Sequence, residues 1–298
     1  MKKLLAVLLT AAMTMAMLTA CGSSTEATDT TTETTEAEAD TTTDDAAVEE
    51  TAEAADAAEE TADTEAAVSE ALADGMLTAG TNAEFPPFEY VGDDGEADGF
   101  DIALIKAIGE KLGVDVQVDN MEFASLVSSI GNKIDVAIAG MTITDERKEA
   151  VDFSEPYYEA VQYVLLPEGS EIATAEDLKN KTIGVQLGTT GDFIASDIEG
   201  TTVNTYNKGV DAVNDLINGR VECVIIDKNP ALVFESKFQD DGSKITAVDG
   251  AQFEFEPEYY AIAVPKGDTA LVDAINKAIE ELKADGTFDE LVKTYIEE

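Results

Sequence analysis

From residue 76 onward, short apolar runs of strand length alternate with segments whose apolar residues recur at helical spacing. The predicted strands of the first half are 76–81, 115–121 and 134–140. Between them, 100–113 and 123–133 carry apolar residues three or four positions apart, which is typical of one face of a helix. Strand, helix, strand, helix and strand in this order predict a parallel sheet with helices on its faces.

The same alternation repeats after residue 180. It predicts strands at 182–188, 201–206, 221–227 and 259–267. It also predicts helices at 189–198, 210–219, 229–238, 268–286 and 287–298. Two α/β units of similar size indicate two lobes. Because ligands of such sheets bind at the carboxyl ends of the strands, a cleft between the lobes is the expected site.

The first 20 residues have the pattern of a targeting segment. Two lysines follow Met1, and an apolar stretch too short to be trusted as a membrane span comes next. It ends in "LTAC", which resembles the lipobox of bacterial lipoproteins. In those proteins the cysteine, here Cys21, becomes the lipidated first residue of the mature chain. The alternative is an ordinary signal peptide whose cleavage site lies near a cysteine.

Charge separates the next segment from the rest of the chain. Residues 22–75 hold eighteen acidic and no basic residues, with almost no large apolar side chain. Such a composition cannot bury enough surface to fold, so we expect 21–75 to be a disordered acidic tether. Residues 76–298 carry 45 acidic and 16 basic residues, a net charge of −29. Nucleic acid is therefore excluded as a partner, because phosphate binding needs a basic face.

Several kinds of chemistry are missing from the sequence. The chain has no histidine, which removes Ser-His, Cys-His and histidine-metal sites, and it has no phosphate-binding glycine loop with its lysine. The acidic stretch 93–101 does not complete a calcium-binding loop, so it is interpreted as a polar hairpin turn. Cys223 lies in an apolar run and is expected in the core. No catalytic residue, metal ligand or cofactor is predicted.

Four features at strand ends remain as candidate binding chemistry. Arg147, one of only two arginines, follows the strand 134–140, and Thr144 can cap the helix that begins there. A cation in a first helical turn opposes the helix dipole, so a buried carboxylate would explain it. The alternative is a surface arginine paired with Asp145 or Glu146.

The other three features also have two interpretations each. "GTTGD" at 188–192 offers backbone N–H groups to an anion, or only caps a helix. Asp227 ends an apolar strand, where it either receives an ammonium group or simply begins the next helix. Phe85 and Phe88 flank a Pro-Pro turn and either cover a ligand or belong to the core. Together these groups could bind a free α-amino acid without changing it.

Five stretches in this order resemble the family 3 extracellular solute-binding proteins, which serve polar amino-acid ABC importers. They are "GFDIALIKAIGEKLG", "GMTITDER", "VDFSEPYY", "VQLGTTGD" and "IIDKNPA", and the match covers 76–298. Ala103 departs from the family signature, which has an acid there. The resemblance implies an α/β, two-lobed periplasmic-binding-protein-like (Venus-flytrap) fold. Lobe 1 would comprise 76–160 and 258–298, and lobe 2 would comprise 161–257, with two crossovers.

The resemblance also implies roles for individual residues. Arg147 would bind the ligand α-carboxylate, helped by the backbone N–H groups of Thr142 and Thr190. Asp227 and the carbonyl of Gly140 would hold the α-ammonium group. Phe85 and Phe123 would sandwich the side chain. The remaining predicted site residues are Asn82, Glu84, Met141, Gln186 and Thr189.

Charge leaves the side chain of the ligand undecided. Relatives with cationic ligands often have Asp where this chain has Asn82, although Glu84 and Glu159 could compensate. Both neutral polar and cationic amino acids therefore stay open. The predicted protein is an extracytoplasmic, lipid-anchored monomer that delivers its amino acid to ABC permease subunits. The alternatives are a flytrap sensor acting through a partner, or a lyase on the same fold.

Overall fold

The computed structural model describes residues 69–240 and 242–297. The predicted leader, Cys21 and the acidic segment up to residue 68 lie outside these residues. The predicted disordered tether, 21–75, is wrong for its last seven residues. A 3-10 turn at Glu70–Leu72 precedes the first strand, and Ser69 donates a hydrogen bond of 2.6 Å to Asp268. Leu72 packs against the core.

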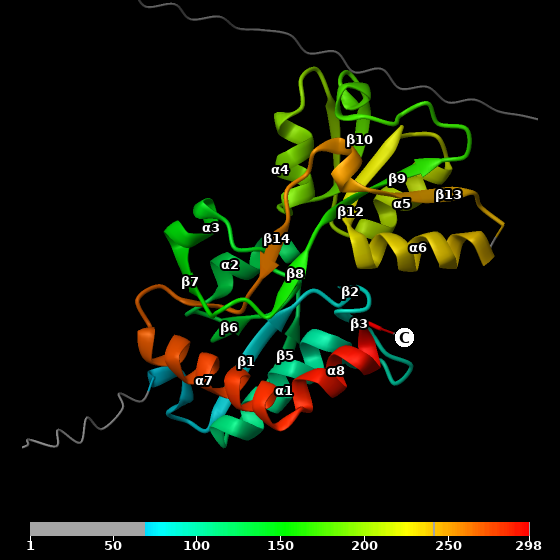
Figure 1. Cartoon of the computed structure of the whole chain (residues 1–298). Helices are drawn as coiled ribbons and strands as arrows, with labels where there is room; N and C mark the ends of the chain where they lie inside the picture. The colour runs from blue at the N-terminus through cyan, green and yellow to red at the C-terminus, as the bar shows by residue number, and fades with distance from the viewer. Residues whose placement is uncertain (1–68, 241, 298) are drawn as a thin grey trace, which may run out of the picture. The chain divides into compact units, whose positions relative to one another are not determined.

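One five-stranded sheet has the strand order β5-β1-β6-β15-β7 (Figure 1). Its strands are β1 (Met76–Thr81), β5 (Asp115–Asn120), β6 (Val136–Ala137), β7 (Val151–Phe153) and β15 (Ala263–Pro265). The helices of this part are α1 (Phe100–Leu112), α2 (Leu126–Ser129), α3 (Asp145–Ala150), α7 (Thr269–Asp285) and α8 (Thr287–Tyr295). β1 pairs in parallel with β5 and β6, as predicted, whereas β15 pairs antiparallel with β6 and β7.

The second five-stranded sheet has the order β11-β10-β12-β9-β13. Its strands are β9 (Gln162–Pro167), β10 (Thr182–Gln186), β11 (Thr202–Tyr206), β12 (Cys223–Asp227) and β13 (Ile245–Asp249). Its helices are α4 (Thr190–Asp197), α5 (Gly209–Ile217) and α6 (Lys228–Asp240). Here too the three predicted strands are parallel, and β9 runs antiparallel to β12 and β13. Both sheets are therefore mixed rather than purely parallel.

Two short strands run between the sheets. β8 (Tyr158–Ala160) and β14 (Glu258–Tyr260) pair antiparallel and lie side by side in Figure 1. We propose that they carry the two crossovers, with lobe 1 comprising 76–160 and 258–298 and lobe 2 comprising 161–257. A separate three-stranded sheet in lobe 1 is formed by β2 (Glu84–Phe85), β3 (Glu89–Val91) and β4 (Ala97–Asp98). The turn between β3 and β4 lies in the acidic stretch 93–101, which was interpreted as a hairpin turn and which continues through β4 into the start of α1.

Three predicted elements differ from the structure. The helix 123–133 is a 3-10 turn, Phe123–Ser125, followed by the four residues of α2, which ends where Ile130 adopts an extended conformation ahead of Gly131, with a φ of +75°. The strand 134–140 contributes only two residues to the ladder, since the chain then turns away through Gly140. The strand 259–267 is two strands, β14 and β15, which belong to different sheets.

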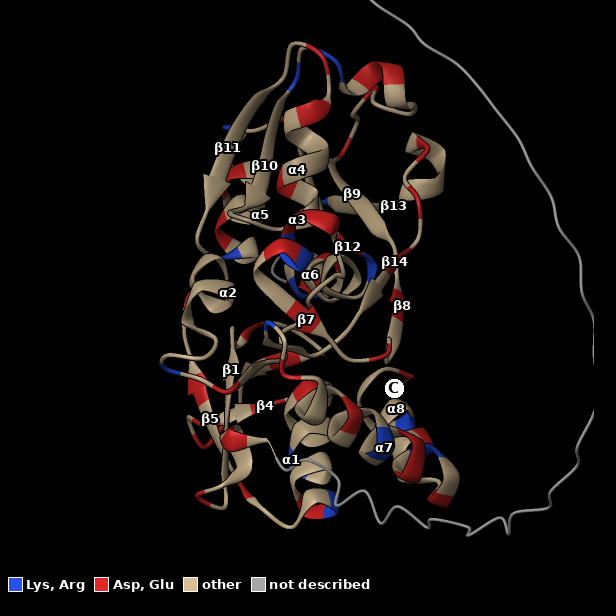
Figure 2. Ribbon diagram, turned by 90° about the vertical axis from the view of Figure 1, so that its left-hand side faces the viewer, with Lys and Arg blue, Asp and Glu red and all other residues tan. Residues whose placement is uncertain are grey.

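The core consists of apolar side chains between helices and sheets in both lobes. Leu77, Leu104 and Ile105 of lobe 1 and Val224 and Leu216 of lobe 2 are almost fully buried. The surface is acidic, and Figure 2 shows red Asp and Glu positions on helices and strands of both lobes with few blue ones. Among residues 69–240 and 242–297, no helix is both long and apolar enough to cross a membrane.

Candidate functional site

Arg147 lies in the interior of the protein, so its interpretation as a surface residue is wrong. It is 6% exposed and sits in the first turn of α3, where its backbone N–H donates to the hydroxyl of Thr144. Its guanidinium donates to the carbonyl oxygens of Thr142 (2.6 Å) and Gly188 (3.0 Å). Asp145, its suggested surface partner, instead pairs with Lys148.

This buried guanidinium has no ion-pair partner in the part of the chain that the structure describes. No Asp or Glu oxygen of residues 69–240 and 242–297 lies within 4.0 Å of it. Burial lowers the pKa of Arg147, and the negative charges of Glu258 and Asp227 raise it. Because a guanidinium stays charged in proteins, the positive charge is present and available to an incoming anion.

Asp227 supplies the opposite charge at the end of β12. It is 7% exposed and accepts a hydrogen bond of 2.5 Å from the hydroxyl of Tyr260. Burial, and next the negative charge of Glu258, raise the pKa of Asp227 to about 7, while the Tyr260 hydrogen bond lowers it. α6 begins at Lys228, so Asp227 both precedes a helix and faces the interior. Its two interpretations are therefore compatible.

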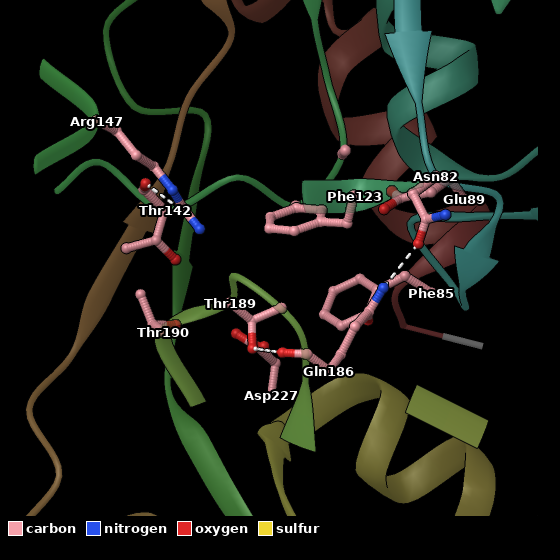
Figure 3. A pocket seen from close by; sticks show the side chains of 12 residues that line it. Asn82, Phe85, Glu89, Phe123, Thr142, Arg147, Gln186, Thr189, Thr190 and Asp227 are labelled. Atoms are coloured by element: carbon pink, nitrogen blue, oxygen red, sulfur yellow. Dashed lines mark hydrogen bonds between the residues drawn. The ribbon is translucent and has the colours of Figure 1, made fainter. Parts of the chain in front are cut away.

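A pocket joins these two residues (Figure 3). Its lining residues are Asn82, Phe85, Glu89, Phe123, Ala139, Gly140, Thr142, Arg147, Gln186, Thr189, Thr190 and Asp227. Ten of the twelve predicted site residues are in this set, and they come from both lobes. The structure thus brings together side chains that are up to 145 positions apart in the sequence, counted from Asn82 to Asp227.

The other two predicted residues, Glu84 and Met141, do not line the pocket. Glu84 forms an ion pair with Lys208 of lobe 2, which occupies the carboxylate. Met141 is fully buried in an apolar cluster with Val151. Its neighbours Gly140 and Thr142 line the pocket, whereas the Met141 side chain packs into this cluster.

The two aromatic residues of the Pro-Pro turn have different roles. Phe88 is 1% exposed and packs edge-on against Tyr260, with ring centroids 5.2 Å apart, so it belongs to the core. Phe85 lines the pocket. Gly140 has a φ of +52°, and a Cβ atom there would lie 2.9 Å from the Phe85 ring. Glycine at 140 is therefore required both by the backbone and by the position of Phe85.

Glu89 is a pocket residue that the sequence analysis missed. It is fully buried, and among the described residues its hydrogen-bond neighbour is the carboxyl group of Asp101, to which a protonated Glu89 can donate. Burial, and then the charge of its neighbour Asp101, raise its pKa well above the usual range. Asp101 itself accepts from the Gly140 N–H (2.7 Å) and the Tyr157 hydroxyl (2.8 Å). Glu89 alternates inward on the short strand β3, a signal too brief to detect in the sequence.

Several hydrogen bonds across the pocket connect the lobes. The side-chain amide of Gln186 donates to the carbonyl oxygen of the Asn82 side chain (2.8 Å), as the dashed line in Figure 3 shows. Arg147 reaches Gly188 of lobe 2, and Lys208 reaches Glu84 of lobe 1. At the lobe 2 side, the hydroxyl of Thr189 accepts from the backbone N–H of Asp192 and caps α4. The lobes are therefore closed over the pocket.

The sequence also matches a known family over this whole region. The family described as bacterial extracellular solute-binding proteins, family 3, matches residues 77–298. The chain belongs to this family. Its members are binding proteins of transport systems rather than enzymes, and the two-lobed periplasmic-binding-protein-like fold is shared with solved relatives.

Relatives within the family carry names that state their ligands. The L-cystine-binding protein TcyJ of Escherichia coli (strain K12) is 34% identical over 231 residues, covering 76% of this chain and 85% of TcyJ. The arginine-binding extracellular protein ArtP of Bacillus subtilis (strain 168) is 35% identical over 225 residues, covering 74% and 85%. The arginine-, lysine-, histidine-binding protein ArtJ of Geobacillus stearothermophilus has a solved structure with a TM-score of 0.69 and 34% identity, covering 75% and 96%.

Proposed function

We propose that this protein is a lipid-anchored extracytoplasmic receptor that binds a free α-amino acid and delivers it to an ABC importer. One observation carries the proposal: a buried guanidinium without a carboxylate partner among the described residues shares a pocket with a buried carboxylate, Asp227. A zwitterion supplies the missing counter-charge to each. The printed names of the family relatives, which include cystine and arginine binders, support the same class of ligand.

The pocket supports a definite orientation of the ligand. The α-carboxylate lies against Arg147 and receives further hydrogen bonds from the backbone N–H groups of Thr142 and Thr190. Thr190 is the first residue of α4, so its N–H has no intrahelical partner and faces an anion favourably. The α-ammonium group lies between Asp227 and the Gly140 carbonyl, and the rings of Phe85 and Phe123 flank the side chain.

Glu89 favours a cationic side chain. Among the residues lining the pocket, the only carboxyl groups belong to Asp227 and Glu89, and Glu89 has no cationic partner among the described residues, only the neighbouring carboxyl group of Asp101. A guanidinium or ammonium group on the ligand would form an ion pair with Glu89. Its positive charge would lower the pKa of Glu89 and favour the ionised carboxylate. Asn82 and Gln186 offer amide groups that suit a polar side chain but do not require a charge.

The attachment and delivery steps rest on the leader and on the closed lobes. Cys21 is proposed as the lipidated residue, and the acidic segment after it as the tether. Two-lobed receptors change between open and closed forms, and a ligand that contacts both lobes shifts this equilibrium toward closure. The closed form is then the one that the permease recognises, with a monomeric receptor as partner.

Ligand binding is tested by calorimetry and thermal shift on the purified protein with the twenty amino acids and cystine. A ligand at a hundredfold its Kd should add about 2.7 kcal/mol to the free energy of unfolding. Arg147→Lys should lower the affinity more than a hundredfold with the fold intact, because a point-like ammonium cannot make the paired hydrogen bonds. Arg220→Lys is the matched control, since Arg220 is exposed and pairs with Asp215. Absence of any ligand, or equal affinity of both variants, would overturn the proposal.

Selectivity is tested with Glu89→Gln, which keeps the size of the side chain and removes its charge. Affinity for arginine or lysine should fall at least tenfold, while affinity for glutamine should change less than threefold, because a hydrogen bond to a charged group is worth about 1.5–3 kcal/mol. Glu256→Gln, an exposed acid outside the pocket, should leave both affinities unchanged. Equal losses for charged and neutral ligands would show that Glu89 supports the fold rather than selecting charge.

A further inference from the structure

Glu258 holds together two threonines that belong to different lobes. Its Oε2 atom accepts hydrogen bonds from the hydroxyl of Thr142 in lobe 1 and from the hydroxyl of Thr190 in lobe 2, both at 2.7 Å. The side-chain amide of Gln162 approaches the same oxygen at 3.4 Å. Glu258 itself is the first residue of β14, the strand that pairs with β8 between the lobes.

The local structure explains why this side chain reaches the pocket. Side chains alternate along a strand, so Glu258 and Tyr260 share one face of β14 while Tyr259, between them, is 46% exposed. Tyr260 uses this face to donate to Asp227. The backbone around Thr142 lies directly beside β14, because Ile143 N–H donates to the Tyr259 carbonyl at 2.9 Å. Glu258 and Tyr260 therefore reach the two ends of the proposed amino-acid site.

Glu258 does not take the place of the ligand carboxylate. It is the first charge to raise the pKa of Arg147, yet neither of its oxygens lies within 4.0 Å of the guanidinium. Instead it accepts hydrogen bonds from the hydroxyls of Thr142 and Thr190. Only the backbone N–H groups of these two residues then remain as hydrogen-bond donors to the ligand. Hydrogen bonds to an ionised acceptor are shorter and about twice as strong as neutral ones.

We propose that Glu258 is a positioning residue of the binding site: it clasps Thr142 and Thr190 across the closed cleft, aims their backbone N–H groups at the ligand α-carboxylate, and favours closure. The clasp needs both threonines at one oxygen, so it exists only when the lobes are closed. The part of the proposal that concerns the ligand rests on the proposed amino-acid function, whereas the part that concerns closure does not.

The affinity test uses Glu258→Ala, Glu258→Gln and Thr190→Val. Glu258→Ala should weaken ligand binding at least tenfold, mainly through faster dissociation, because the closed form loses its clasp. Glu258→Gln keeps an oxygen that can accept both hydrogen bonds, although as a neutral acceptor, so it should weaken binding less than Glu258→Ala does. Glu256→Ala, an exposed acid two residues earlier, should have no effect. An affinity of Glu258→Ala within twofold of the Glu256→Ala control would overturn the proposal.

A double-mutant cycle tests whether Glu258 and Thr190 act as one unit. If Thr190→Val alone also weakens binding about tenfold, the double variant should lose little more than either single variant, since both remove the same contact. A hundredfold loss in the double variant would mean that the two effects add and that no clasp exists. If Glu258→Ala does not fold, Thr142→Val combined with Thr190→Val removes both hydroxyls and gives the same test.

Two further readouts separate the clasp from a general structural role. Spin labels at Lys106→Cys in α1 and Lys237→Cys in α6, with Cys21→Ser, report the distance between the lobes without ligand, and Glu258→Ala should widen it. This holds even if no amino acid binds, so failure of the proposed function is distinguishable. Glu258→Gln should also move the pH midpoint of binding downward, because the charge of Glu258 raises the pKa of Asp227. An unchanged distance in Glu258→Ala, or an unchanged pH profile in Glu258→Gln, would overturn the proposal.

The pH readout depends on every charged group around Asp227. Tyr260 donates to it from β14, and Arg147 of α3 and Glu89 of β3 interact with it electrostatically. Burial raises the pKa of Tyr158 of β8, and the negative charge of Asp227 raises it further. Glu258→Gln leaves all four of these neighbours in place, so a downward shift of the midpoint is assigned to Glu258 alone.

Discussion

Binding should weaken about tenfold when the pH is lowered from 8 to 6, because Asp227 must be ionised to hold the ligand ammonium group. Burial raises the pKa of Asp227 to about 7 in the empty site. Below this pH the free protein carries a proton there, and the ligand must displace it. The apparent Kd therefore rises by a factor of about ten for each pH unit below the pKa and is constant above it.

The magnitude follows from the same pKa. At pH 8 nearly all of the empty protein has an ionised Asp227, while at pH 6 only about one molecule in eleven does. The difference corresponds to about 1.4 kcal/mol of binding free energy. The raised pKa of Glu89 adds to this for a ligand with a cationic side chain, so such a ligand should lose more than tenfold.

Titration calorimetry at several pH values, in buffers of different ionisation enthalpy, measures both the affinity and the proton released on binding. Release of up to one proton per neutral ligand near pH 6 is expected, falling toward zero at pH 8. Asp227→Asn binds weakly at every pH and should show no release from this position. An affinity that stays constant from pH 5.5 to 8 would refute the assignment of Asp227 to the ammonium group.

Three further predictions concern single residues. Gly140→Ala should lower ligand affinity more than tenfold by displacing Phe85, as calorimetry would measure. Gly95 is the control: it also has a positive φ, +87°, but a Cβ atom there would meet no atom within 4 Å. Gly95→Ala should therefore lower only the free energy of unfolding, by about 1–2 kcal/mol, as thermal unfolding would measure. Tyr260→Phe should move the pH midpoint of binding upward, opposite to Glu258→Gln, because the lost hydrogen bond had lowered the pKa of Asp227. Glu84→Gln should weaken binding less than about fivefold for any ligand, since it removes a part-exposed ion pair with Lys208 outside the pocket. A loss of affinity for cationic ligands alone would mean that Glu84 does contribute to the binding site.

The sequence predicts the parallel part of each sheet well, because strand and helix periodicities repeat in a fixed order there. It does not predict β9 and β13. Their apolar runs are short, and their antiparallel pairing joins residues about 80 positions apart, as in Leu165 with Ala247. Such pairing has no local signal. β14 and β15 merge into one predicted strand for a related reason, since nothing in "YYAIAVP" marks where the chain leaves one sheet for another.

The site residues also differ in how far local sequence predicts them. Asp227 ends a strand, and Thr190 and Arg147 lie in the first turns of the helices that come after strands, so the rule that ligands bind at strand ends leads to them. The roles of Glu89 and Glu258 depend on how distant segments approach each other. Glu89 faces inward from a three-residue strand, and Glu258 meets threonines 116 and 68 positions away. Neither residue stands out in a chain with 63 acidic residues.

In a protein this acidic, the absence of a carboxylate partner for Arg147 among the described residues is informative. Residues 76–298 contain 45 carboxylates, yet none of the described ones pairs with this guanidinium. A buried charge without a partner destabilises a protein by several kcal/mol, and carbonyl oxygens compensate only in part. The buried carboxylate of Asp227 would also be destabilising without a partner, but in the empty site below pH 7 it is protonated and neutral. A zwitterionic ligand relieves both groups at once, whereas a lone carboxylate or a lone amine relieves one and leaves the other unpaired. We therefore expect selectivity for α-amino acids, because the described residues leave both buried groups without an ion-pair partner.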